Sequence, residues 1–413
     1  MQLPLPGSGT DIRPADPDAV IAVSRVPELL NNDPAGFAWG VWHDRTPKLV
    51  AQILDGHPYG DAQRRALESL LQEIDSGPMR PLSDDAADAP AWQRWGEPYV
   101  GRPWADAPFL WSESYFFRRV MDALDFFRPG QWFWIDPFEQ LKAAELDDPV
   151  LEADLAALDD VAGLPPDEQA QAKLLASLWG NRADLGFRVG LAEGSAHPEQ
   201  EGLVADQSAD LLQALADAPG TVIVVADNAG RELVSDLVLI DHLLQTGAAD
   251  RIDLHVKPHP YYVSDATSAD VIACLRRLAA TPGGSAQIAA RLWDVMSGGR
   301  LTVSTHWFHT APWSWHHMPA DLAAVYAAAS LTVLKGDLNY RRLVGDRAWA
   351  ATTPFDEVTR YFPGPVAALR TLKSDVAIGI DADRLAALDE SSPAWRTSGT
   401  HGLIQLRHLV AAP

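Results

Sequence analysis

The chain has 413 residues, 47% of them hydrophobic, and its 56 Asp plus Glu outnumber 33 Lys plus Arg to give a formal charge of −23. This length and composition are typical of a soluble globular protein with a large core and room for two domains. The negative charge repels nucleic acid and anionic membranes, which excludes both as expected partners, and a phosphorylated substrate would need a locally positive site.

The first half of the chain has mostly helical patterns. Residues 1–17 are rich in Pro, Gly and Asp and are expected to be flexible. Apolar residues recur three and four positions apart, which predicts helices over 64–74, 113–127 and 151–158. The stretch 78–108, rich in Pro, Asp, Ala and Trp, is expected to be a long loop. We therefore predict a mostly helical domain over 18–200, with a linker at 192–202.

The second half has a different pattern. Short β-branched runs alternate with helical segments, which predicts strands over 221–226, 251–257, 300–304, 331–336 and 368–373. Strands that alternate with helices favour a mainly parallel sheet covered by helices. The predicted fold class is α/β: a helical N-terminal domain followed, over 201–413, by a three-layer α/β/α Rossmann-like domain that binds metal and phosphate.

The pair Asp227-Asn228 lies between a buried strand and a helix whose apolar residues recur over 233–244. In open α/β sheets this carboxyl edge is where ligands bind. A carboxylate beside a carboxamide offers oxygen ligands to a hard cation such as Mg²⁺ or Mn²⁺. Taken alone, however, such a pair is more often a helix N-cap.

Other polar residues follow later strands of the predicted sheet: Asp265, Asp337, Asn339, Arg341 and Lys373. Strands of one parallel sheet share a carboxyl edge, so these side chains are expected to converge with the first pair. Plainer roles remain open, since the acidic residues could cap helices or form turns and the two cations could be solvated.

Seven motifs, in this order along the chain, resemble the DUF89 damage-control phosphatases, in the acidic-residue methyltransferase 1-like branch. They are ESYFFRR (113–119), WIDPFEQLK (134–142), LWGNRADL (178–185), DNAGRELVSDL (227–237), YYVSDAT (261–267), KGDLNYRRLVGDRAW (335–349) and LRTLK (369–373), the last containing the RTxK pattern of this branch. The chain departs from the usual family pattern at KPHPYYVSD (257–265) and SGTHGLIQ (398–405).

The resemblance implies a phosphatase that acts on small phosphorylated metabolites, including sugar phosphates such as fructose 1-phosphate. It implies Mn²⁺ as the metal, with Co²⁺, Ni²⁺ or Mg²⁺ as substitutes, held by Asp227, Asn228 and Asp265. The implied catalytic residues are Asp227, Asn228 and Lys373. The implied substrate contacts are Glu113, Asp337, Asn339, Arg341 and Lys373.

Two other functions are alternatives to the phosphatase. Relatives have been proposed to methylate protein carboxylates with S-adenosylmethionine, through contacts that would include Asp227 and Glu232, but the chain has no glycine-rich adenosine-binding loop. A non-catalytic phosphometabolite sensor is the second alternative. A zinc site at His306, His309 and nearby histidines has no obvious third ligand, so an aromatic wall is the favoured interpretation there.

The expected location is the cytoplasm. Cys274 is the only cysteine, so no internal disulfide can form. The N-terminus lacks a basic segment followed by an apolar one, and no apolar run approaches the ~18 residues of a membrane span. The sequence makes no prediction of oligomeric state.

Overall fold

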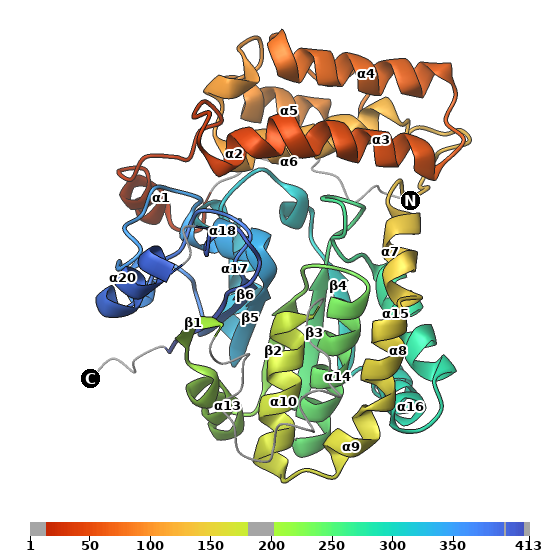
Figure 1. The fold of residues 1–413 in the computed structure, drawn as a ribbon, viewed down its shortest axis with the longest axis vertical. Coiled ribbons are helices and arrows are strands. Elements are labelled where there is room, and N and C mark those ends of the chain that lie inside the picture. Colours follow the sequence, from red (N-terminus) through yellow and green to blue (C-terminus); the bar gives the residue numbers. More distant parts are fainter. Residues whose placement is uncertain (1–13, 181–201, 392–393, 409–413) are drawn as a thin grey trace.

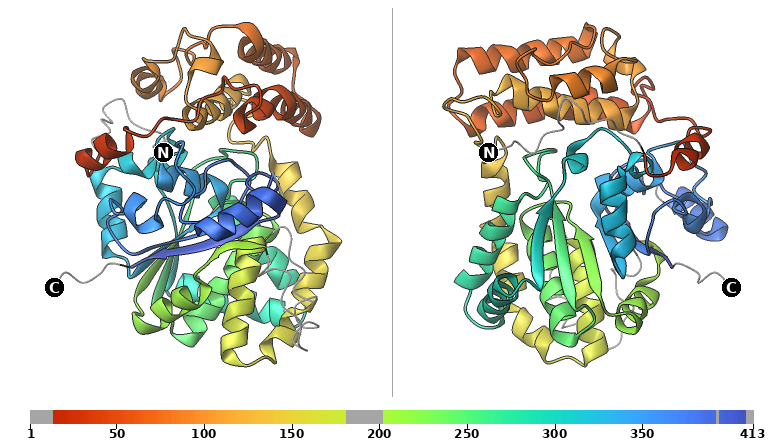
Figure 2. Two further views of the ribbon diagram at one scale, coloured as in Figure 1. Left: turned by 60° about the vertical axis from the view of Figure 1, so that its left-hand side comes forward. Right: turned by 180° about the vertical axis from the view of Figure 1, so that it is seen from behind.

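A computed structural model of the chain describes residues 14–180, 202–391 and 394–408. A helical cap lies over one edge of a seven-stranded sheet, and helices cover both faces of the sheet (Figure 1). The same cap and body are seen from two further sides in Figure 2. The predicted α/β fold class is confirmed. Most of the expected flexible segment and of the expected linker lies outside the described residues.

The cap is built from helices that range from a single turn to 16 residues in length. It comprises α2 (Phe37–Gly40), the π-helix η1 (Val41–Arg45), α3 (Thr46–Gly56), α4 (Asp61–Ser76), α5 (Ala89–Gly96), the 3-10 helix η2 (Trp104–Asp106) and α6 (Phe109–Ala123). Its interior is aromatic, because Trp42, Trp104, Phe109 and Phe116 are buried and their rings contact one another. Many of the Trp residues of this chain therefore form the core of the cap.

The sheet is mainly parallel, as predicted. Its strands are β1 (Leu203–Asp206), β2 (Thr221–Val225), β3 (Arg251–Val256), β4 (Leu301–Thr305), β5 (Leu331–Lys335), β6 (Val366–Thr371) and β7 (Gly402–Arg407). They lie in the order β1-β7-β6-β5-β2-β3-β4, and every pair is parallel except β6 and β7.

Alternate residues of the central strand β2 face opposite sides of the sheet. Val222 and Val224 join one hydrophobic cluster, while Ile223 and Val225 join the other. The first cluster includes residues of α8 (Pro149–Ala156), α9 (Leu158–Ala162), α10 (Pro166–Trp179), α13 (Ser208–Asp217), α14 (Arg231–Thr246), α15 (Ser268–Ala280) and α16 (Gly284–Ser297). A strand buried on both faces reads as a continuous apolar run, which is why its prediction was straightforward.

The other face is covered by short helices and is continuous with the aromatic core of the cap. These are η3 (Trp307–Thr310), η4 (Trp315–His317), α17 (Ala320–Ala328), α18 (Gly336–Val344), α19 (Phe355–Val358) and α20 (Ala382–Ser391), with α1 (Pro17–Val23) beside η4. The helix α7 (Glu139–Leu146) leads down from the cap (Figure 1). Helix α10 packs against α14, so the last helices of the span 18–200 lie on the sheet.

The strand order reverses between β2 and β5. From β2 the chain moves outward to β3 and β4, and it then returns to place β5 on the opposite side of β2. A crevice forms at such a reversal because the connections that leave the two adjacent strands diverge. The segments that follow β2 and β5 carry Asp227-Asn228 and Asp337.

The structure corrects four local predictions. Strands β1 and β7 were not predicted: β1 has only four residues, and β7 is defined by pairing with β1 and with β6 on either side. Within the expected loop 78–108, α5 forms with a proline in its first turn and buries Trp92 and Trp95. The helix predicted over 113–127 spans Phe109–Ala123 instead, and it is followed by Asp125 with a φ of 58°.

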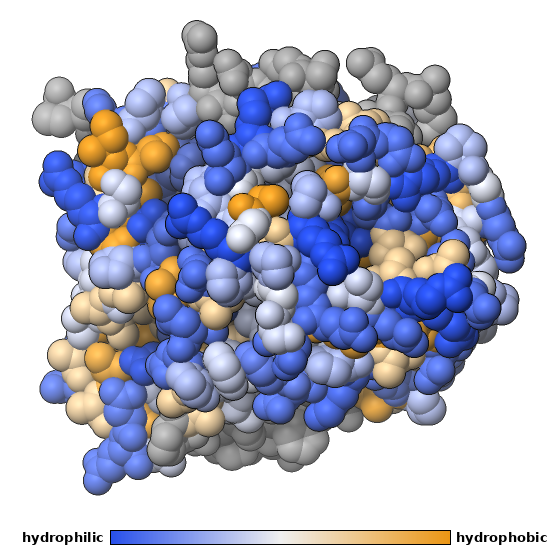
Figure 3. All heavy atoms as spheres, turned by 90° about the horizontal axis from the view of Figure 1, so that it is seen from above, coloured by the Kyte–Doolittle hydropathy of each residue, from blue (hydrophilic) through white to orange (hydrophobic). Residues whose placement is uncertain are grey.

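The outer face of the cap, seen from above in Figure 3, carries mostly hydrophilic side chains, and its apolar side chains lie in scattered patches. Among the described residues, no helix is both long enough and apolar enough to cross a membrane.

Candidate active site

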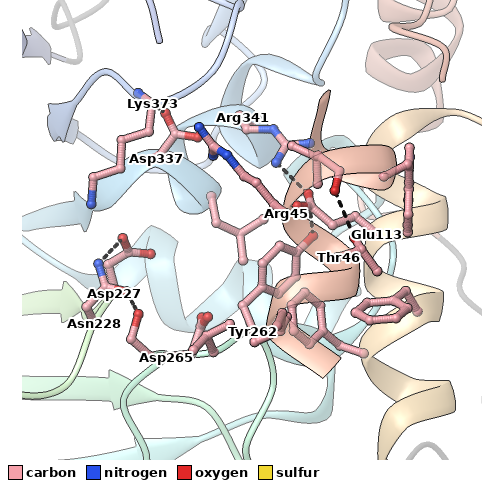
Figure 4. Close-up of a pocket in the computed structure, with 18 of the residues that line it drawn as sticks. Arg45, Thr46, Glu113, Asp227, Asn228, Tyr262, Asp265, Asp337, Arg341 and Lys373 are labelled. Atoms are coloured by element: carbon pink, nitrogen blue, oxygen red, sulfur yellow. Dashed lines mark hydrogen bonds and ion pairs between the residues drawn. The ribbon is translucent and has the colours of Figure 1, made fainter. Parts of the chain in front are cut away.

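A cavity of about 500 Å³ lies between the cap and the carboxyl edge of the sheet. Its sheet side is formed by Asp227, Asn228, Val263, Ser264, Asp265, Asp337, Leu338 and Lys373, and its cap side by Phe37, Val41, Trp42, Arg45, Thr46, Lys48, Leu49, Gln52, Glu113, Phe116 and Phe117. Tyr262 and Arg341 line the space between them. The residues that line the cavity therefore come from segments that are far apart in the sequence, from Phe37 to Lys373 (Figure 4).

Asp227 and Asn228 come from the loop that links β2 to α14. The Asp227 side chain is only 6% exposed, and the Asn228 amide donates to Asp227 Oδ2 at 3.0 Å and to Glu232 Oε2 at 2.8 Å. The Asn228 carbonyl oxygen accepts a hydrogen bond from Ser264 at 2.6 Å. These contacts fix the two side chains, and neither caps α14, whose N-cap is Gly230 without a side-chain cap bond.

Asp265 reaches the same place because its loop folds back onto the end of β2. Backbone N–H groups of Ala229 and Ala266 donate to the carbonyls of Ser264 and Asp227, at 2.7 and 2.8 Å. This antiparallel bridge sets Asp265 beside Asn228, although 36 residues separate Asn228 from Ser264. The predicted convergence of these three side chains is what the structure shows.

The three side chains hold an excess of buried negative charge. Burial, together with the negative charges of Glu232 and Asp265, raises the pKa of Asp227 well above its ordinary value. Burial also raises the pKa of Asp265, although the ammonium of Lys257 lies 3.2 Å from its Oδ1. Both members of this ion pair are buried. Two such carboxylates and one amide oxygen are a donor set that suits a hard divalent cation.

Asp337 and Lys373 approach from the neighbouring strands β5 and β6. One carboxylate oxygen of Asp337 accepts from Arg370 Nε at 2.8 Å, from the Lys373 backbone N–H at 3.0 Å and from Ser374 Oγ at 3.1 Å. Burial alone would raise the pKa of Asp337, but Arg370 and Arg341 bring it below the ordinary value. The arrangement fixes Asp337 as a carboxylate and directs the exposed Lys373 side chain along the cavity wall (Figure 4).

Arg341 lines the cavity, but its guanidinium is already paired. It makes two bonds of 2.9 Å to the Asp346 carboxylate and one of 2.7 Å to Glu113 Oε2. Glu113 also accepts from Tyr262 at 3.1 Å, and burial raises the pKa of Glu113 despite these partners. The guanidinium that the resemblance implied as a substrate contact is therefore occupied by Asp346 and Glu113, and Arg341 joins the cap to the body.

Asn339 is the one predicted substrate contact that the structure does not bring to the cavity. It is fully buried, and its amide donates to the backbone carbonyls of Ala226 and Lys335, at 3.1 and 2.8 Å. Because it follows Asp337 by two positions in a helix, its side chain points away from the side that carries Asp337 and Arg341. The contact with Ala226 ties α18 to the end of β2.

Sequence reasoning missed the contribution of the first cap helices. Arg45 and Lys48 line the cavity from η1 and α3, in a stretch that carried no recognised motif. Their spacing of three was the only available signal, because it places two cations on one helix face. With these two, the described residues that line the cavity include as many basic as acidic side chains, in a chain whose formal charge is −23.

The alternative zinc site is not supported. In the described parts of the chain, no three His, Cys, Asp or Glu side chains are arranged to hold a metal ion. His309 is buried beside Tyr326 and Trp315, and His316 stacks on Tyr361 with ring centroids 3.7 Å apart. These histidines belong to an aromatic wall, as the sequence indicated.

Comparison with known proteins identifies the family. A family model described as the damage-control phosphatase ARMT1-like domain matches residues 41–388. The chain belongs to this family. Damage-control phosphatase ARMT1 of Danio rerio is 30% identical over 423 residues, which cover 89% of this chain and 94% of that protein. The human protein of the same name is 26% identical over 431 residues, covering 91% of this chain and 97% of that protein.

The resemblance inferred from the seven motifs is thus confirmed at the level of the family, which is a family of phosphatases and hence of hydrolases. Of the motif at 178–185, only 178–180 is described. A crystal structure of a DUF89 family protein from Pyrococcus horikoshii is also similar, with 13% identity, a TM-score of 0.47 and coverage of 82% of this chain and 92% of that one.

Proposed function

We propose that this ARMT1-like protein is a metal-dependent phosphomonoesterase of small phosphorylated metabolites, with sugar phosphates such as fructose 1-phosphate among its substrates. One observation carries the proposal: two buried carboxylates, Asp227 and Asp265, lie with Asn228 in the same cavity as the cation Lys373. Phosphate ester hydrolysis needs charge neutralisation around the phosphoryl group, and this cavity supplies both a cation-binding donor set and a free ammonium.

We propose Mn²⁺ as the metal, with Co²⁺, Ni²⁺ or Mg²⁺ able to replace it. Asp227, Asp265 and Asn228 would hold it, and the raised pKa of Asp227, beside the negative charges of Glu232 and Asp265, supports a cation at this place. The Asn228 carbonyl oxygen keeps a second lone pair besides the one that accepts from Ser264. When bound, such an ion supplies Lewis-acid stabilisation of phosphoryl oxygens and a more acidic water.

The other residues of the cavity would bind and orient the substrate. Lys373 places a point charge beside the phosphoryl oxygens. One oxygen of Asp337 accepts hydrogen bonds from Arg370, Lys373 and Ser374, so its second oxygen can accept a hydrogen bond from a hydroxyl of the substrate. We favour attack by water rather than by an aspartate, and trapping of an aspartyl-phosphate by rapid quench would contradict this choice.

The methyltransferase alternative receives no support from the site. It would use Glu232 as a contact, but Glu232 is 6% exposed, accepts a bond from Asn228 and does not line the cavity. A non-catalytic sensor would not need the two buried carboxylates, Asp227 and Asp265, that line the cavity.

The test is a screen of sugar and nucleotide monophosphates with Mn²⁺, Co²⁺, Mg²⁺ or EDTA. We expect phosphate release that requires metal. In Asp227→Ala and Asp265→Ala, kcat/KM should fall by about a hundredfold or more while the circular dichroism spectrum is kept. Lys373→Ala should also lower kcat/KM, because its ammonium would face the phosphoryl group.

The matched control is Asp61→Ala, which removes an 89% exposed carboxylate from α4 of the same protein. Full activity of either ligand variant would remove that residue from the proposed metal site. Release that persists in EDTA would reject metal dependence. Methylation without hydrolysis would favour the transferase, and saturable binding without either reaction would favour the sensor.

A further inference from the structure

Two basic side chains of the cap face the cavity from the side opposite the sheet. Arg45 is the last residue of η1, and Lys48 lies three positions later in α3. Gln52 follows four positions after Lys48 and lines the cavity too, so one helix face presents all three polar side chains to the same space. In Figure 4, Arg45 extends from the cap helix into the cavity that Asp227, Asp337 and Lys373 line.

Neither cation is bound to a carboxylate in the parts of the chain that the structure describes. The Arg45 guanidinium lies 5.1 Å from the centre of the Phe37 ring, a cation–π contact that leaves its N–H groups free. Arg341 is the opposite case, since two carboxylates occupy its guanidinium. The guanidinium available to an anion in this cavity is therefore that of Arg45.

We propose that Arg45, with Lys48 beside it, binds the phosphoryl group of the substrate from the cap side. The inference rests on the proposed phosphatase function and names residues of that same site. A guanidinium matches two phosphoryl oxygens with two parallel N–H bonds, and its contact with Phe37 limits the freedom lost on binding. Lys48 adds positive potential one turn further along α3. The substrate would then lie between Arg45 on the cap and Lys373 on the sheet.

A simpler view is that both residues are solvated cations at the rim of the cavity. The two views predict different affinities for phosphate. If Arg45 only interacts with water, its removal changes nothing but net charge. If it binds the phosphoryl group, its removal deletes a charge-assisted pair of hydrogen bonds.

The experiment measures two quantities for each protein, supplied with Mn²⁺: the Kd for inorganic phosphate by calorimetry, and kcat and KM for the best substrate of the screen. We expect Arg45→Gln to weaken phosphate binding and to lower kcat/KM by about tenfold to a hundredfold. Arg45→Lys should be intermediate because it keeps the charge and loses the fork. Lys48→Gln should have a smaller effect of the same sign.

Arg65→Gln is the matched control. Arg65 belongs to α4 of the same cap, its side chain is 71% exposed, and it makes only a local ion pair of 3.8 Å with Asp61. It should leave Kd and KM within about twofold of the wild type, as surface pairs contribute little. If Arg65→Gln and Arg45→Gln weaken phosphate binding and lower kcat/KM equally, the effect comes from net charge and the inference is overturned.

Unchanged phosphate affinity in Arg45→Gln would also overturn it. If the wild type releases no phosphate from any ester, the proposed function fails, but the phosphate titration still tests Arg45 by itself. Thermal unfolding of each variant checks that the fold is kept. Both cations are exposed, so their replacement is expected to leave the unfolding temperature within about 2 °C.

Discussion

Replacement of Gly336 by alanine would test whether the position of the Asp227 carboxylate controls activity. Gly336 begins α18 with a φ of +82°, a conformation that costs an alanine about 1–2 kcal/mol. A Cβ atom at this position would also overlap the carboxyl group of Asp227. The end of β5 approaches the end of β2 this closely only because residue 336 has no side chain.

The overlap is too deep to be relieved by a small adjustment, so the Asp227 carboxylate must move by roughly 1 Å, a displacement that can lower a rate by about a hundredfold. We therefore expect Gly336→Ala to reduce kcat/KM by about a hundredfold, which corresponds to about 2.7 kcal/mol of transition-state stabilisation. The loss of unfolding free energy should be larger than the backbone cost alone.

Gly247→Ala is the matched control. Gly247 ends α14 with a φ of +77°, and a Cβ atom there would meet nothing within 4 Å. It should lose about 1–2 kcal/mol of unfolding free energy, measured by urea denaturation, and keep full activity. The reasoning is refuted if folded Gly336→Ala keeps kcat/KM within a factor of about three, or if Gly247→Ala loses as much activity.

Two further predictions concern stability and its dependence on pH. Asp88 binds Arg118 through bonds of 2.8 and 2.6 Å in the cap core. Replacement of Asp88 by alanine leaves the buried guanidinium of Arg118 without its carboxylate and should lower the free energy of unfolding, measured by urea denaturation, by about 3–5 kcal/mol. A decrease below about 1 kcal/mol would contradict this expectation. Burial lowers the pKa of His316 to about 3. Below about pH 6.5 the imidazole of His316 becomes protonated in the unfolded chain but stays neutral in the folded protein. The contribution of this residue to the free energy of unfolding is therefore complete above about pH 6.5 and is lost as the pH falls. Between pH 7.5 and pH 5, the free energy of unfolding of the wild type should fall by about 2 kcal/mol relative to that of His316→Gln. If the difference between the two proteins does not change with pH, the assignment is refuted.

Much of the fold could be predicted because it is encoded in local patterns. Strands β2, β5 and β6 are runs with clear limits, since almost all of their residues are buried between layers of helices. Strands β3 and β4 alternate with helical segments along the chain, although β4 lies at one edge of the sheet and is only partly buried. Strands β1 and β7 carry weaker patterns, and their existence depends on partners far away in the chain. In α5 the decisive factor is the burial of Trp92 and Trp95 against other aromatic rings, which composition alone does not reveal.

The sequence by itself, through the shared carboxyl edge of the predicted strands and through its motifs, indicated that Asp227, Asn228, Asp265, Asp337 and Lys373 would lie together, and the structure places all five at one cavity. Tertiary structure decided which of the remaining polar groups are free to act. Arg341 pairs with Asp346 and Glu113, and Asn339 bonds to backbone carbonyls. Among the described residues that line the cavity, Arg45 has a guanidinium without a carboxylate partner. The reason is physical: a charge or amide can bind a ligand only if no partner already satisfies it, and partners are set by contacts across the whole chain.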